Sequence, residues 1–269
     1  MTDRLPNSLL YYTSQIANYT TNKVRLNTLN TDTLASNGAS QLRLALPVNS
    51  VLNLRSLTLN TTFESSGVPA TKDANGNSEN NAVYGLIPRN GVSSVLDRVT
   101  WSLAGIQADN GTTPYHTLYN VKQNLNKSTQ KYMTDDKVLS QSCIEPIDET
   151  SARAISDQGQ TKDLKVNNFL GFTQAFPSYF NMNIVPECFL TIQIAGSNVL
   201  PVQYQGKALG DRTQTKDNTG FTGTQCEFRM SNIYFTVEVC QIGSGMYSML
   251  IERLMNERGS IDVPYPQFS

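Results

Sequence analysis

The chain has 269 residues, of which 39% are hydrophobic and 16% charged, and its formal net charge is −1. This length suits two compact domains, and polarity that comes mainly from Asn, Thr, Ser and Gln suits the exposed faces and turns of β-sheets. No run of Lys or Arg occurs, which argues against direct binding of nucleic acid, because such binding needs many cationic contacts to phosphate.

Residues 1–35 are expected to form an N-terminal arm. Apolar side chains recur at helical spacing after Ser8, a candidate N-cap, and a polar stretch follows them. The helical face consists of Leu9, Leu10, Tyr12, Ile16 and Tyr19. No secretion signal or membrane-spanning run is visible, so we expect synthesis in a reducing cytoplasm and buried free thiols. The thiols concerned are Cys143, Cys188, Cys226 and Cys240.

Alternating apolar residues predict strands in the first half. The alternation of Leu42, Leu44 and Leu46 is followed by Leu52 and Leu54, and then by Leu57 and Leu59 on the opposite parity. A change of parity indicates a bend or bulge between the two pairs. Residues 65–82 are polar and read as a long, outward-facing loop.

A second unit of the first half begins at residue 91. Residues 91–97 read as a short helical turn, and Val99, Trp101 and Leu103 form a strand with one buried face that ends at Ala104-Gly105. Thr113-Pro114 then provides a helix start. The expected helix carries an apolar stripe made of Tyr115, Leu118, Tyr119, Val121 and Leu125.

The second half shows a comparable plan. A strand is expected at 190–194, a polar loop at 206–223, a strand at 233–239 and a helix at 247–258. Two copies of one β-rich plan favour a mainly β fold made of a duplicated sandwich or of two tandem jelly rolls, with one short α-helix in each half and an N-terminal arm. The expected boundaries are 1–35 for the arm, 36–155 for the first jelly roll and 156–269 for the second.

The segments 91–107, 115–125, 169–194, 230–239 and 247–258 resemble elements of the double-jelly-roll major capsid proteins of membrane-containing icosahedral viruses. The small size is most similar to the corticovirus capsid protein, from a marine bacteriophage. The resemblance implies pseudo-hexagonal homotrimers that tile a virion shell and contact other virion proteins. It also implies that the N-terminal arm lies near an internal membrane.

One loop has the composition of a calcium site. Asp73, Asn75, Asn77 and Glu79 place oxygen ligands at alternate positions around Gly76. Ca²⁺ prefers several such oxygens, although the spacing is not that of an EF-hand. A solvated turn is the simpler interpretation, so Ca²⁺ is considered only as a possible structural ion and no cofactor is expected to be required.

Nothing in the sequence recommends an enzyme. His116 is the only histidine, and no nucleophile motif or zinc-ligand spacing accompanies it. The leading interpretation is therefore a structural protein. One alternative is a jelly-roll carbohydrate- or receptor-binding viral protein that uses loops 65–82 and 206–223. A β-sandwich carbohydrate enzyme with two opposed carboxylates is a third possibility.

Overall fold

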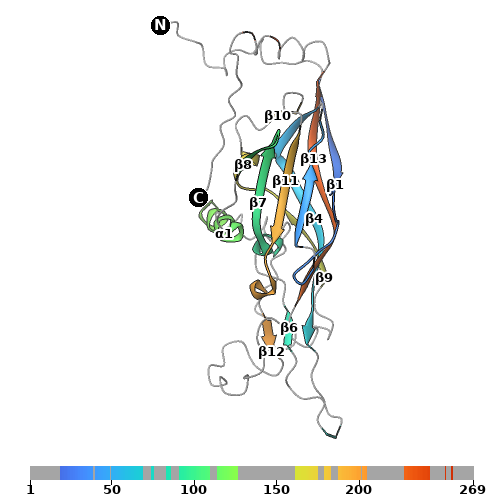
Figure 1. The fold of residues 1–269 in the computed structure, drawn as a ribbon, viewed down its shortest axis with the longest axis vertical. Coiled ribbons are helices and arrows are strands. Elements are labelled where there is room, and N and C mark those ends of the chain that lie inside the picture. The colour runs from blue at the N-terminus through green and yellow to red at the C-terminus, as the bar shows by residue number, and fades with distance from the viewer. Residues whose placement is uncertain are drawn as a thin grey trace.

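The computed structural model describes residues 19–38, 40–48, 50–68, 74–75, 83–85, 91–109, 114–126, 161–174, 179–182, 187–200, 202–204, 227–242, 252 and 256. These residues form two long sheets packed face to face and a small third sheet beyond one end (Figure 1). The protein is thus mainly β, as predicted. Within this described part, the structure contains no helix whose length and apolar character would let it span a bilayer.

The first sheet has four columns of strands. Its order is β1 (Tyr19–Asn27), β13 (Phe228–Ile242), β4 (Val51–Ser65) and then β10 (Tyr179–Asn181). Two further strands extend the outer columns: β2 (Leu34–Ala35) pairs with β13, and β9 (Thr161–Val166) pairs with β4. All of these pairs are antiparallel.

The second sheet also has four columns. Its order is β3 (Gln41–Ala45), β11 (Cys188–Ile194), β7 (Leu96–Leu103) and β8 (Ile106–Asp109), and every neighbouring pair is antiparallel. The small third sheet joins β5 (Gly67–Val68), β6 (Val83–Gly85) and β12 (Val202–Tyr204).

The pairing of the eight columns identifies one jelly roll. Numbered along the chain, with β9 and β10 sharing a column, the first sheet has the order 1-8-3-6 and the second 2-7-4-5. Column 1 therefore pairs with 8, 2 with 7, 3 with 6 and 4 with 5. This is a single antiparallel ribbon, with its tip at the turn between β7 and β8, rolled into a two-sheet jelly roll.

The expected tandem arrangement is therefore wrong for the described strands. Strands on both sides of the expected 155/156 boundary share both sheets, so 36–155 and 156–269 are not separate jelly rolls here. The physical reason is that the repeated plan in the sequence reflects the two arms of one ribbon. Strands of the first arm complete their hydrogen bonds with strands of the second arm, which alternation alone cannot reveal.

The expected N-terminal arm, 1–35, also needs correction. Residues 19–27 form β1, which pairs with β13 along its whole length, and residues 34–35 form β2. The polar composition of β1 concealed this strand, because its side chains from Thr20 to Val24 are exposed on both faces. The helix expected around residues 9–16 lies outside the described residues.

The helical elements are short. They are η2 (Gly91–Val95), α1 (Tyr115–Asn126), η3 (Gly171–Gln174) and η4 (Ser197–Val199). The helical turn predicted after residue 91 and the helix predicted after Pro114 are both confirmed. Of the helix predicted at 247–258, the structure describes only Glu252 and Asn256, which are helical and exposed.

The core lies between the two long sheets, as the period-two patterns predicted. The largest side chains that are almost completely buried are Trp101, Phe63, Phe169, Phe172, Phe228 and Phe235. Phe63 and Phe228 stack with ring centroids 5.5 Å apart, and Phe172 contacts both Trp101 and Phe180. Trp101 was predicted to be a core residue, and this is confirmed.

Two irregularities shape the strands. The predicted parity change in β4 is confirmed: Asn53 pairs with Glu238 and Thr58 with Thr236, so residues 54–57 bulge opposite Val237. This bulge lets Leu54 and Leu57 both reach the core. The predicted end of β7 at Ala104-Gly105 is also confirmed, as a two-residue hairpin turn with φ values of 49° and 80°.

Candidate assembly surface

Helix α1 lies on one flank of the jelly roll (Figure 1), and it has both buried and exposed apolar side chains. Tyr115 and Tyr119 are buried against the core. The Tyr115 hydroxyl accepts the backbone N–H of Leu170 at 2.9 Å, and the Tyr119 hydroxyl donates to the Asn167 carbonyl at 2.9 Å. These two bonds attach the helix to the segment that leads into η3.

The other apolar face of α1 points away from the core. Val121 is 51% exposed and Leu125 81% exposed, although both belong to the apolar stripe that the sequence predicted. The strands at the same edges add Ile106 on β8, which is 74% exposed, and Tyr179 on β10, which is 45% exposed. We call the surface formed by α1, β8 and β10 the α1 wall.

The opposite flank consists of β1, residues 28–33 and β3, and we call it the β1 wall. It exposes Val24 and Leu29 together with three cationic residues, Lys23, Arg25 and Arg43. The Arg25 guanidinium lies 4.1 Å from the centroid of the Tyr234 ring, and that of Arg43 lies 3.8 Å from the Phe189 ring. Stacking on an aromatic face orients each cation while leaving it near solvent.

A shallow groove on the β1 wall is lined by Leu29, Asn30, Gln41, Arg43 and Thr191. Asn30 Nδ2 donates to the Gln41 carbonyl at 2.9 Å, and Asn30 Oδ1 accepts from the Arg43 N–H at 2.8 Å. The side-chain amide of Asn30 therefore takes the place of a neighbouring strand along the edge of β3.

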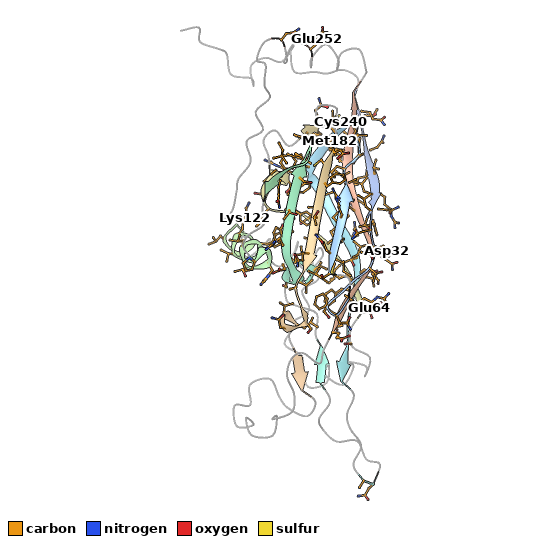
Figure 2. The ribbon with its side chains drawn as sticks, viewed as in Figure 1. Asp32, Glu64, Lys122, Met182, Cys240 and Glu252 are labelled. Carbon is orange, nitrogen blue, oxygen red and sulfur yellow. The ribbon has the colours of Figure 1, made fainter. Side chains whose placement is uncertain are left out.

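Three of the described titratable groups have shifted pKa values, and each shift has a cause in the packing around the group. Lys122 on α1 (Figure 2) donates to Gln174 Oε1, and burial lowers its pKa. Burial raises the pKa of the Cys188 thiol to about 12, and burial together with the nearby Glu238 raises the pKa of Cys240. Both thiols are free and buried, as predicted, and both are in the neutral, unreactive form near neutral pH.

The structure describes only one of the four predicted calcium ligands. Asn75 lies in an exposed turn, whereas Asp73, Asn77 and Glu79 are outside the described residues. Most of loops 65–82 and 206–223, proposed for the alternative binding function, also lie outside them. Where the chain is described, no three His, Cys, Asp or Glu side chains gather as metal ligands.

His116 lies on α1 and is half buried. Its Nδ1 has no hydrogen-bond partner among the residues that the structure describes. The same holds for the indole Nε1 of Trp101, which lies wholly inside the core. The exposed apolar residues of the two walls were not found from sequence motifs, because exposed apolar residues carry no motif of their own.

Comparison with known proteins gives no relative by sequence. No family model matches the chain, and no curated protein matches it.

Comparison of the fold finds viral capsid proteins. The quasi-atomic model of the PBCV-1 virus capsid gives a TM-score of 0.45 at 11% identity, over 86% of this chain and 44% of that chain. PBCV-1 VP54, fitted into a reconstruction of the virophage Sputnik, gives 0.46 at 11% identity with the same coverages. The mavirus major capsid protein gives 0.40 at 12% identity, over 89% and 52%. The chain spans about half the length of these proteins.

Proposed function

We propose that this protein is a structural subunit of a viral capsid, located in the virion shell, and that its activity is self-assembly rather than catalysis. The observation that carries the proposal is the position of its exposed apolar side chains. Of the seven large hydrophobic side chains described as exposed, six lie on the β1 wall or the α1 wall. Apolar residues on opposite flanks of a rigid sandwich favour side-by-side packing of copies.

The oligomer that we propose is a closed ring of copies. The resemblance implied a homotrimer with two jelly rolls in each chain. Six jelly rolls in one trimer would explain its pseudo-hexagonal shape. The described strands form one jelly roll, and with this one jelly roll per chain a trimer contains three of them, so that a six-walled block requires six chains. Closed rotational symmetry satisfies both flanks of every copy and prevents open-ended fibres.

The further partners are also proposals. Residues 1–18, which precede β1, would contact an internal virion membrane, and the rims of the jelly roll would contact other virion proteins. The likeness to corticoviruses, and hence a bacteriophage origin, rests on the sequence patterns alone. Synthesis in the host cytoplasm follows from the same expectation.

Calcium binding at Asp73, Asn75, Asn77 and Glu79 is proposed as a way to order an exposed loop, with oxygen ligands suited to this cation. Titration calorimetry of the purified protein with CaCl₂ tests it. Heat of binding that disappears in the variant Asp73→Ala/Glu79→Ala supports the site. No heat in the native protein contradicts it, without bearing on assembly.

The capsid proposal is tested by the mass of the purified protein in sedimentation, combined with electron microscopy. With a chain of 29.7 kDa, a trimer has a mass of about 89 kDa and a hexamer about 178 kDa. Discrete closed oligomers that associate into shells or sheets support the proposal. A strict monomer at all concentrations contradicts it, and glycan-array binding by that monomer would favour the carbohydrate- or receptor-binding alternative.

A further inference from the structure

The exposed side of α1 forms a ridge in a defined position. The helix packs against β7 and η2, and hydrogen bonds of Tyr115 and Tyr119 attach it to the segment before η3. Val121 and Leu125 lie one helical turn apart on its outer side, where they are 51% and 81% exposed. We call these two side chains the α1 ridge.

The groove on the β1 wall has chemistry that complements this ridge. Leu29 gives the groove an apolar side, because its side chain is 59% exposed. Arg43 gives it a cationic side, and stacking on Phe189 orients the guanidinium. Aliphatic side chains entering the groove would bury Leu29 and leave the cation at the rim of the contact, where charged groups keep part of their water.

The last turn of α1 complements the cation as well. Leu125 lies in this turn, which contains no basic residue of its own. The C-terminal end of a helix carries a partial negative charge and favours a nearby cation. Arg43 of another copy can supply that cation when Leu125 packs against Leu29 of the same copy.

The ridge and the groove lie at the same level along the strands, on opposite flanks of the sandwich (Figure 1). Gln41 of the groove pairs with Gln193 of β11, and Gln193 pairs with Arg98 near the start of β7. Helix α1 packs against η2, which ends directly before β7. Rotation about an axis parallel to the strands therefore brings ridge and groove together without a shift along that axis, which closes a ring instead of a helical filament.

Contacts between like walls are less favourable. Two β1 walls in contact would bring Lys23, Arg25 and Arg43 of both copies together, and like charges repel each other. Two α1 ridges in contact would leave the groove of each copy unused and Leu29 in water. The arrangement that uses both surfaces is head-to-tail.

We propose that the α1 ridge of one copy docks in the β1-wall groove of the next, with Leu125 against Leu29 and Arg43 beside the last turn of the helix. This inference rests on the proposed capsid function and specifies the contact that closes its ring. The aliphatic contact supplies affinity. The cation determines which end of the helix lies at Arg43.

Mixing two complementary full-length variants tests this contact. Val121→Ser/Leu125→Ser lacks the ridge and keeps the groove, whereas Leu29→Ser/Arg43→Ser lacks the groove and keeps the ridge. Each variant alone should stay monomeric at concentrations at which the native protein assembles. An equimolar mixture should form a dimer of about 59 kDa, twice the chain mass of 29.7 kDa, and nothing larger, because the dimer has no further intact ridge or groove.

The matched control is Val48→Ser/Arg55→Ser, which removes one exposed apolar and one exposed cationic side chain outside both walls. It should assemble like the native protein. A groove variant that dimerises alone would overturn the inference in favour of ridge-to-ridge pairing. Assembly of either variant to the native mass would also overturn it, while leaving the capsid proposal intact. A native protein that is monomeric at every concentration would contradict the capsid proposal itself.

Disulfide trapping detects the same contact when it is weak. A disulfide requires Cα atoms within about 7 Å, so Leu29→Cys and Leu125→Cys proteins should form a covalent dimer when they are mixed and oxidised. The oxidised native protein and each variant alone should not. A covalent dimer from Leu125→Cys alone, or native-mass oligomers of the mixture without a crosslink, would overturn the head-to-tail contact.

Discussion

At the scale of single residues, alternation along a strand decides which side chains leave water. In β11 the buried positions are Cys188, Leu190, Ile192 and Ile194, and the residues between them are only partly covered. A thiol at such a position behaves as a small apolar group. Ionising it would place a charge in the core, which is why its pKa is raised to about 12.

This raised pKa predicts a specific loss of stability in alkali. Below pH 9 the thiol is neutral in both the folded and the unfolded chain, so its contribution is fully present. Between pH 9 and 12 only the unfolded chain ionises, and the free energy of unfolding falls by about 1.4 kcal/mol per pH unit. Denaturant titrations at several pH values should show that the free energy of unfolding of native protein falls more steeply than that of Cys188→Ala by this slope, because all other titrating groups are common to both proteins. Parallel curves would contradict it.

At the scale of elements, the turn between β7 and β8 forms the tip of the ribbon. Ala104 and Gly105 both have positive φ, which matches the twist of a two-residue hairpin. A Cβ added at Gly105 would meet no atom within 4 Å, so only its backbone conformation restricts this position. Alanine at the first position is conformationally strained, whereas Asn adopts positive φ more readily.

Opposite effects are therefore expected at the two turn residues. Ala104→Asn should stabilise the fold by about 0.5 kcal/mol, and Gly105→Ala should destabilise it by about 1 kcal/mol or more. Thermal unfolding of the two variants beside the native protein measures both signs. A lower melting temperature for Ala104→Asn would contradict this account of the turn.

A second element-scale prediction concerns the closed edge of β3. The variant Asn30→Ala removes the acceptor for the Arg43 N–H and should cost about 1 kcal/mol. Exchange of the Arg43 amide should accelerate, and edge-to-edge aggregation should increase. Asn198→Ala, on an exposed residue of η4, is the matched control and should change neither property.

At the scale of the whole molecule, the two flanks differ from the rest of the sandwich in their exposed apolar residues. If the α1 wall meets another copy, replacing Val121 and Leu125 by Ser should weaken assembly and leave the monomer stable, because both side chains are already more than half exposed. Sedimentation should show at least a ten-fold higher dissociation constant, with unchanged unfolding in denaturant. An unchanged constant would remove the α1 wall from the interface.

The α1 wall shows which features of the candidate site could be predicted from the sequence. The exposed residues Val121 and Leu125 were correctly placed on the apolar stripe of an amphipathic helix, but the sequence did not predict which part of that stripe is buried. The helix buries Tyr115 and Tyr119 and turns the remaining stripe outward. The spacing of apolar residues indicates that a helix has an apolar face. It does not indicate whether that face packs against its own chain or against another copy.

The sequence by itself determined the β class, the strands around Trp101, Leu190 and Phe235, the bulge in β4 and the helix after Pro114. Each depends on local spacing, propensity or turn chemistry within a few residues. The pairing of strands in three dimensions shows that β1 belongs to the first sheet and that the described strands of both halves form one jelly roll. Those facts depend on which strands share hydrogen bonds, and pairs such as Lys23 with Glu238 are far apart along the chain. Antiparallel strands with similar alternation can pair in many ways, and the packing of the whole core selects one of them.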